Sequence, residues 1–329
     1  MNAVPPPSSV RRRSSALFAA MLTAMAAPGA TGQAVDLTPR FEPGQADVYT
    51  LTQKSENRVA SPGTAKTNPA PADQTLEQSY TLRLSVDEAL PEGGARLSLV
   101  YERVRVKLVT PDRTIEVDSD KPANAADADP ITLALTSIAG TTLRLTADAK
   151  GTIKKVEGGA DTLGLSSLLG QAGGALSGKD AVSVLVPGTA PPTKARVGDT
   201  WTSTSRLAGP LLGDIALTLR HGLESVRAGV ATVAIKGSME PAKAKGAQDS
   251  IARVSSATTD GTYLWNTQRG GLDSLTLRQV VRLESDLIEP GRVMESTSVT
   301  EVRREPPEPK DRGGAEPGTR SPEKPRNPR

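Results

Sequence analysis

Alternating apolar and polar residues recur in both halves of the chain, and this period of two most strongly limits the possible folds. In the first half, Tyr80, Leu82, Leu84 and Val86 alternate with polar residues. The same alternation runs from Ile215 to His221 in the second half. A repeat of two residues is the pattern of a half-buried β-strand, because successive side chains of a strand point to opposite faces.

Glycine and proline separate these segments. Turns are expected at 91–94, at Asp148–Gly151 and near residues 227–229, because such residues favour tight connections between antiparallel strands. The segments on either side of Asp148–Gly151 therefore predict a hairpin. The apolar positions also change phase at residues 100–103, which predicts a β-bulge or a strand covered on both sides.

These patterns predict an all-β, antiparallel protein, built as two similar curved meander sheets or as one continuous half-barrel sheet. One short helix is expected between the repeats, at Asp161–Leu176, where Asp161 and Thr162 can cap its start. Because glycine lowers helix propensity, we expect this helix to be ordered only by packing on the sheet.

The two halves share short matches in the same order. Residues 44–49 correspond to 197–201, 92–99 to 227–235, and 141–145 to 261–265. We interpret them as an internal duplication, although antiparallel meanders in general share such features. The predicted organisation is a signal peptide at 1–34, a first β repeat at 35–158 with a mobile loop at 60–73, a helix and Pro-rich linker at 159–196, a second β repeat at 197–303, and a disordered tail at 304–329.

The N-terminal residues have the features of a secretory signal. Arg11–Arg13 precede the apolar run Ala16–Ala27, and small residues end at Ala34, as in a cleavable signal peptide. The run is shorter than the roughly 20 residues that a spanning helix needs. We therefore expect an exported protein, periplasmic or extracellular, with no transmembrane segment in the mature chain.

Composition removes several classes of function. The chain has no cysteine, which excludes thiol catalysis, thiolate metal sites and iron–sulfur clusters. The formal charge is +3. Arg11–Arg13 are removed with the signal, and residues 304–329 carry an excess of two positive charges. Without these two segments, the net charge of the folded part is about −2. A nucleic-acid partner is not expected, since it requires basic residues concentrated on a folded surface.

Catalytic and metal-binding patterns are weak. His221 is the sole histidine, and no G-x-S-x-G motif supplies a nucleophile for it, so we expect a structural, partly buried residue. Asp118, Asp120, Asp127 and Asp129 could offer oxygen ligands to Ca²⁺, but their spacing matches no calcium-binding loop. We therefore predict no catalytic residues, no metal site and no cofactor.

The few aromatic residues supply the candidate binding site. In a core with so few aromatics, they either seal the sheet or line a groove for an apolar ligand. The candidate ligand-binding residues come from the expected helix and from the second half: Leu165, Leu168, Leu169, Trp201, Tyr263 and Trp265.

Three short motifs support a resemblance. Val197–Trp201, Asp118–Ser119 and Ala149–Gly151, together with the signal, resemble a family of uncharacterised exported bacterial β-rich proteins, classed as a domain of unknown function. The resemblance covers roughly residues 35–303 and implies no activity. The arrangement of sheet and helix is also similar, as a distant architectural analogy, to periplasmic lipoprotein carriers, whose curved half-barrel sheet closes over a helix and holds acyl chains. Fold alone does not give function.

Two functional hypotheses follow. The first is an exported, non-enzymatic protein that binds an apolar or acylated component of the cell envelope, with lipid as the expected partner. The alternative is a structural or interaction protein of the envelope with no small ligand. A hydrolase ranks third. The oligomeric state and the identity of the ligand are left open by the sequence.

Overall fold

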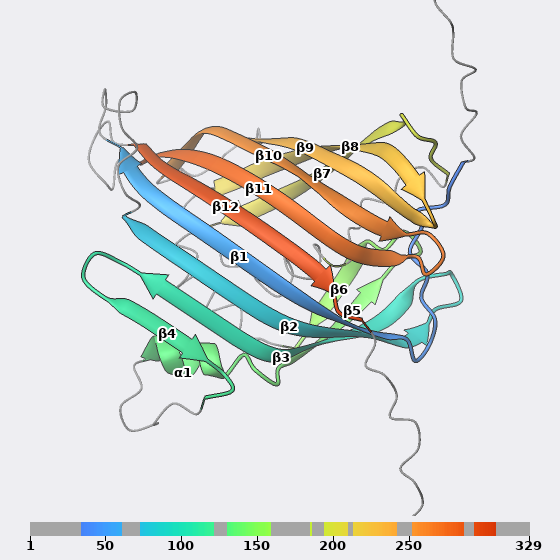
Figure 1. Cartoon of the computed structure of the whole chain (residues 1–329), viewed down its shortest axis with the longest axis horizontal. Helices are drawn as coiled ribbons and strands as arrows, with labels where there is room; N and C mark the ends of the chain where they lie inside the picture. The colour runs from blue at the N-terminus through green and yellow to red at the C-terminus, as the bar shows by residue number, and fades with distance from the viewer. Residues whose placement is uncertain are drawn as a thin grey trace, which may run out of the picture. The chain divides into compact units, whose positions relative to one another are not determined.

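The structure is a computed structural model that describes residues 34–60, 73–121, 130–158, 185, 194–209, 213–241, 252–285 and 293–306. Antiparallel β-strands make up most of them (Figure 1). The strands are β1 Ala46–Ala60, β2 Gln74–Ala89, β3 Ala95–Val109, β4 Thr114–Asp118, β5 Thr142–Ala147, β6 Ile153–Glu157, β7 Thr200–Gly209, β8 Gly213–Arg227, β9 Val230–Pro241, β10 Ala252–Asn266, β11 Gly271–Ser285 and β12 Val293–Arg304.

All twelve strands belong to one open, curved sheet (Figure 1). Its order is β6-β5-β3-β2-β1-β12-β11-β10-β9-β8-β7, with β4 paired to β3 beside this path. The predicted all-β antiparallel class is therefore confirmed, and of the two arrangements the single continuous sheet is the observed one. The order follows the chain as a meander except at two places: β5 pairs with β3 rather than with β4, and β12 pairs with β1.

That junction lies in the middle of the sheet. β1 and β12 pair antiparallel from Tyr49↔Arg304 to Ala60↔Val293, so the first and last strands of the chain are central neighbours. The two edges, β6 and β7, are consecutive along the chain. Residues 158–199 therefore connect opposite edges of the sheet, and its central pairing joins residues that are 233 to 255 positions apart in the sequence.

The expected turns and bulge are present. β5 and β6 form the hairpin around Asp148–Gly151, in which Asp148 Oδ1 accepts hydrogen bonds from the backbone N–H groups of Lys150 and Thr152 at 2.9 Å. The register of β2 and β3 shifts between Thr81 and Leu82. This bulge restores the apolar positions of β3 to one face, as the change of phase in the sequence predicts.

The turn between β8 and β9 contains a strained residue. Ala228 has a φ of 48° and Gly229 a φ of 78°, the left-handed pair that a tight hairpin needs. Alanine adopts this region at a cost that asparagine partly avoids. We expect Ala228→Asn to raise the free energy of unfolding by about 0.5 to 1 kcal/mol in chemical denaturation. Ala149→Asn, in the turn between β5 and β6, is the control, and an equal gain there would contradict this explanation.

One face of the sheet, which we call the inner face, carries the core. It consists of the buried alternate positions of the strands, and a single apolar cluster runs over it from Leu143 and Leu145 of β5 to Leu223 of β8. Leu37 and Leu185, outside the strands, pack against the same cluster. The opposite, outer face is largely polar and charged. Aliphatic side chains fill most of the core, as the scarcity of aromatics in the sequence requires.

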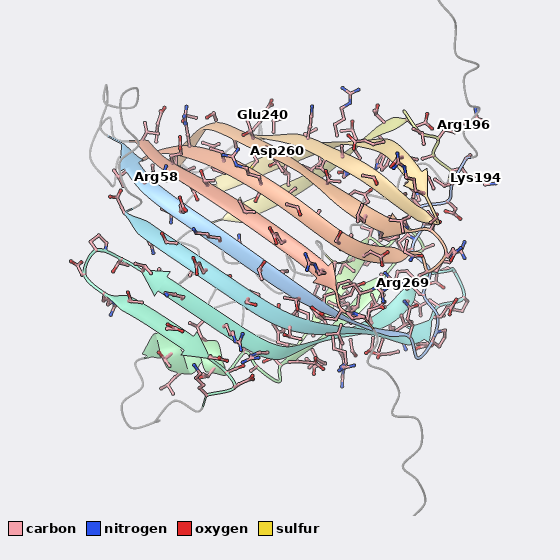
Figure 2. The ribbon with its side chains drawn as sticks, viewed as in Figure 1. Arg58, Lys194, Arg196, Glu240, Asp260 and Arg269 are labelled. Carbon is pink, nitrogen blue, oxygen red and sulfur yellow. The ribbon has the colours of Figure 1, made fainter. Side chains whose placement is uncertain are left out.

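Two arginines and two aspartates join the central strands at one end. Arg269, in the turn after β10 (Figure 2), contacts Asp47 of β1 at 2.7 Å and Asp273 of β11 at 2.9 Å. Arg304 of β12 contacts Asp273 at 3.1 Å and Asp47 at 3.5 Å. We call these four residues the seam network, because they lie where β1, β11 and β12 meet. Removing one partner from such a partly buried network leaves an uncompensated charge, which destabilises the fold.

The seam network also affects a carboxyl group. Burial raises the pKa of Asp273, but hydrogen bonds from Arg269 and Arg304 outweigh it and hold this pKa below its usual range. The ionised carboxylate therefore favours the folded state at neutral pH. This contribution is lost as the pH falls through the lowered pKa.

A short helix that the sequence did not predict, α1 Pro130–Thr136, lies between β4 and β5 and packs against β3 and β4 (Figure 1). Its Leu135 is buried. Within the described ranges, no helix is long and apolar enough to cross a membrane. Several predictions lie outside the described residues: the signal peptide up to residue 33, the loop at 61–72, the helix Asp161–Leu176 and the tail from residue 307.

Candidate functional site

The structure brings the three predicted aromatic residues to the inner face. Trp201 lies on edge strand β7, and Tyr263 and Trp265 lie on β10. Tyr263 and Trp265 are each 4% exposed, whereas Trp201 is half-buried. The other three candidates, Leu165, Leu168 and Leu169, lie outside the described residues.

His221 of β8 connects Trp201 to Tyr263. Its ring stacks on Trp201 with 5.4 Å between centroids and an angle of 11°, and it meets Tyr263 edge-on at 6.2 Å and 69°. The register explains this contact, because Trp201 pairs directly with His221 across β7 and β8. We call Trp201, His221, Tyr263 and Trp265 the aromatic cluster. The cluster lines the inner face between β7 and β10. Its buried ring nitrogens include His221 Nδ1 and Trp265 Nε1.

Ser203 and His221 form a pair that the sequence did not predict. Ser203 Oγ lies 2.9 Å from His221 Nε2, which resembles the nucleophile–base contact of hydrolases. In those enzymes a third group orients the base. His221 Nδ1 has no hydrogen-bond partner among the described residues, and the ring is only 2% exposed. As expected, His221 belongs to the core, and it is buried more deeply than its place in the sequence predicts.

A patch of uncharged polar side chains crosses the inner face next to the aromatic cluster. One row joins Thr259, Gln279, Ser298 and Ser55 from β10 to β1. Residues that pair directly across antiparallel strands share a face, so the patch is continuous. We call it the neutral polar band, and its members are Gln53, Ser55, Asn57, Gln78, Thr259, Gln279, Ser296, Ser298 and Thr300.

The neutral polar band divides the apolar lining into two parts. On β12, the band residues lie between Val302, which belongs to the main cluster, and Met294, which packs against the smaller cluster. On β11, Leu275 and Leu283 flank Gln279 in the same way. The smaller cluster beyond the band consists of Val254, Ala257 and Leu283, with Met239, Val281 and Met294 packed against them.

Several polar atoms on the inner face have no hydrogen-bond partner in the described part of the chain. They are Ser55 Oγ, Gln78 Nε2, His221 Nδ1 and Trp265 Nε1. Ser55 and Gln78 are 1% and 3% exposed. Buried polar groups normally have partners, because leaving one unpaired costs about 1 to 3 kcal/mol. These atoms therefore indicate a place where another molecule can supply hydrogen bonds.

The outer face has a hollow of a different kind. It has a volume of about 880 Å³ and is lined by β12, β1, β2, β3 and β4. Lys54, Glu77, Lys107 and Glu116 alternate in sign across four of these strands. Such cross-strand pairs stabilise a solvated sheet surface, and the balanced charges favour neither an anion nor a cation.

The acidic residues considered as calcium ligands have other partners. Asp118 contacts Arg103 at 3.3 Å and Arg105 at 3.1 Å, and Asp120 contacts Arg103 at 2.6 Å. Asp127 and Asp129 lie outside the described residues. No group of three or more potential metal ligands occurs in the part of the chain that the structure describes.

Sequence reasoning missed the neutral polar band. At residues 53–57 and 296–300, uncharged polar residues occupy every second position, and these positions face inward. A search for alternating apolar residues therefore does not find these segments. Only the pairing of β1 with β12 shows that these segments share one face. The signal that could have found the band was two runs of alternating uncharged polar residues in strand-forming segments.

Comparison with known proteins identifies no family. No family model matches the chain, and no curated protein matches it. Among solved structures, DynF from the dynemicin biosynthesis pathway of Micromonospora chersina aligns with 8% identity and a TM-score of 0.20, covering 83% of this chain and 86% of that one.

Two further solved structures align at similarly low scores. One, from Bacteroides fragilis, is described as exported with a YmcC-like fold, and it aligns with 8% identity, a TM-score of 0.19 and coverages of 82% and 100%. The other, from Parabacteroides distasonis, is described as a lipoprotein, and it aligns with 11% identity, a TM-score of 0.17 and coverages of 81% and 97%. Likenesses this low establish neither a shared fold nor a function.

Proposed function

We propose that this chain is an exported, non-enzymatic protein that binds an apolar or acylated component of the cell envelope on its inner face. Export rests on the N-terminal residues Arg11–Ala34, which have the composition of a secretory signal. Binding rests on the inner face, where a wide apolar lining includes the aromatic cluster. Sites for small ligands are mostly apolar, with a few polar groups that orient the ligand.

One observation carries the proposal. Ser55, Gln78 and Trp265 present buried polar atoms to the inner face without partners in the described chain. A face that served only to pack the core would be expected to carry apolar residues at these positions, since each unpaired group lowers stability. A ligand with apolar chains and a few polar atoms would satisfy both parts of this lining.

The alternative is an interaction protein of the envelope without a small ligand. The observation that favours it is the β7 edge, Thr200–Gly209, which is ten residues long and pairs only with β8 among the described strands. Long unprotected edge strands can pair with a strand of another chain. In this alternative the inner face binds nothing, so ligand binding distinguishes the two functions.

Tryptophan fluorescence tests the proposal directly. Trp201 and Trp265 are the only tryptophans, and both lie on the inner face. Titration with a fatty acid or a lysophospholipid is expected to change the emission in a saturable way. The matched variants Trp201→Phe and Trp265→Phe assign the signal to one ring. An unchanged emission, with no complex in equilibrium dialysis, would contradict the proposal and favour the interaction protein.

A further inference from the structure

We infer that the neutral polar band recognises the uncharged ester or amide linkage of an acylated ligand, so that a neutral acyl ester binds in preference to a hydrocarbon or a fatty-acid anion. This inference rests on the proposed function and adds the chemical class of ligand. It concerns the part of the inner face between the two apolar clusters, and its two central side chains, Ser55 and Gln78, lie on β1 and β2 rather than on the strands of the aromatic cluster.

The band offers hydrogen-bond donors at fixed positions. Tyr80 donates a hydrogen bond of 2.8 Å to Gln78 Oε1, which orients the amide of Gln78 with its Nε2 group free of partners in the described chain. Ser55 Oγ is likewise without a partner there. An amide nitrogen donates only, and a hydroxyl both donates and accepts. A carbonyl oxygen and a neighbouring hydroxyl or N–H group would satisfy the two side chains.

The two donors are close enough to act on one linkage. Gln53 of β1 pairs with Gln78 of β2, and Ser55 is two residues further along β1. Ser55 and Gln78 are therefore diagonal neighbours on the same face, about 7 Å apart between backbones. This spacing matches adjacent polar groups on a small linkage such as an acyl glyceride, rather than separate sites.

The charge of the band determines which ligands it disfavours. None of its side chains is ionisable, so a buried anion would find no cation to offset the loss of its hydration. The charged side chains of the inner face belong to the seam network, where arginine and aspartate already pair. A carboxylate or phosphate is therefore disfavoured at the band, and a hydrocarbon leaves the donors unpaired.

Apolar side chains flank the band on both sides along the strands. From Gln53 to Asn57 the band extends about 13 Å along β1, at roughly 3.3 Å per residue. Beyond it, Met239 and Met294 are only partly buried. Methionine side chains adapt to varied apolar shapes. This end of the inner face is therefore the expected way in for an acyl chain, with the linkage resting on the band.

The test compares three probes with the same chain: monoolein, oleate at pH 8, and octadecene. Binding is measured by fluorescence and by equilibrium dialysis on the wild type and on Ser55→Ala/Gln78→Leu. The control is Ser79→Ala, a serine on β2 that faces the outer hollow. Should the double variant fail to fold, Gln78→Met alone replaces it, because that side chain keeps a similar volume and loses only the amide.

The wild type is expected to bind monoolein at least tenfold more tightly than oleate or octadecene. The double variant should lose about tenfold in monoolein affinity, as expected for two hydrogen bonds, while octadecene binding stays within about twofold and Ser79→Ala resembles the wild type. Equal affinities for all three probes, or an equal loss for all three in the double variant, would overturn this inference and leave the proposed function standing. If none of the three probes binds, both this inference and the proposed function are overturned.

Discussion

Arg269→Met is expected to lower the free energy of unfolding by about 3 kcal/mol. Arg269 is 20% exposed and contacts Asp47 at 2.7 Å and Asp273 at 2.9 Å. It also donates a hydrogen bond of 2.7 Å to the backbone oxygen of Leu272. Removing it leaves the two partly buried carboxylates with one described cation, Arg304, and with neutral hydrogen bonds from Gln45 to Asp47 and from Asn266 to Asp273. Urea denaturation followed by circular dichroism measures the loss.

A surface pair provides the matched control. Arg282 contacts Glu295 at 2.8 Å, but its side chain is 56% exposed, so Arg282→Met should cost less than about 1 kcal/mol. Adding Asp47→Asn to Arg269→Met should recover part of the stability, because Arg304 then stays paired with Asp273 at 3.1 Å and the remaining charges of the seam network balance. Similar losses for Arg269→Met and Arg282→Met would contradict a role of the seam network in joining the central strands.

The second large effect is a dependence of stability on pH that arises from one side chain. Burial lowers the pKa of His221 to about 4 from an ordinary value of 6.5. Above pH 6.5 the imidazole is neutral in both the folded and the unfolded chain. As the pH falls from 6.5 towards 4, the unfolded chain gains a proton that the folded protein does not. The free energy of unfolding should therefore decrease over this range, by on the order of 3 kcal/mol.

Because the chain has a single histidine, a variant isolates this effect. His221→Phe keeps an aromatic ring beside Trp201 and removes the titrating group, so the slope between pH 6.5 and 4 should largely disappear. Ser203→Ala removes only the hydrogen bond to Nε2 and should retain the slope. Denaturation at a series of pH values measures both, and an unchanged slope in His221→Phe would show that other groups cause it.

Much of the fold could be predicted from the sequence because its information is local. The alternation at residues 80–86 and the turn at Asp148–Gly151 depend on neighbours in the chain, and both are found as expected. The pairing of β1 with β12 depends on residues that are 233 to 255 positions apart in the sequence. No local period records such a contact, which is why the choice between one sheet and two stayed open.

The site was predicted only in part for the same reason. Trp201, Tyr263 and Trp265 stand out by residue type, and the structure places them on one face. Ser55 and Gln78 are ordinary polar residues in the sequence, and only their burial and register make them notable. His221 was expected to be partly buried, but it lies in the interior of β8, and its near-complete burial depends on Trp201 and Tyr263 packing against it.

Native mass spectrometry of the protein, purified without added lipid from cells that naturally produce it, tests the central claim most directly. If the inner face holds an acylated component of the envelope, the folded protein should carry a bound mass in one-to-one ratio, and fragmentation should release a molecule with acyl chains. Ser55→Ala/Gln78→Leu should carry less of it than Ser79→Ala. A folded wild-type protein with only the mass of its own chain would contradict the binding function.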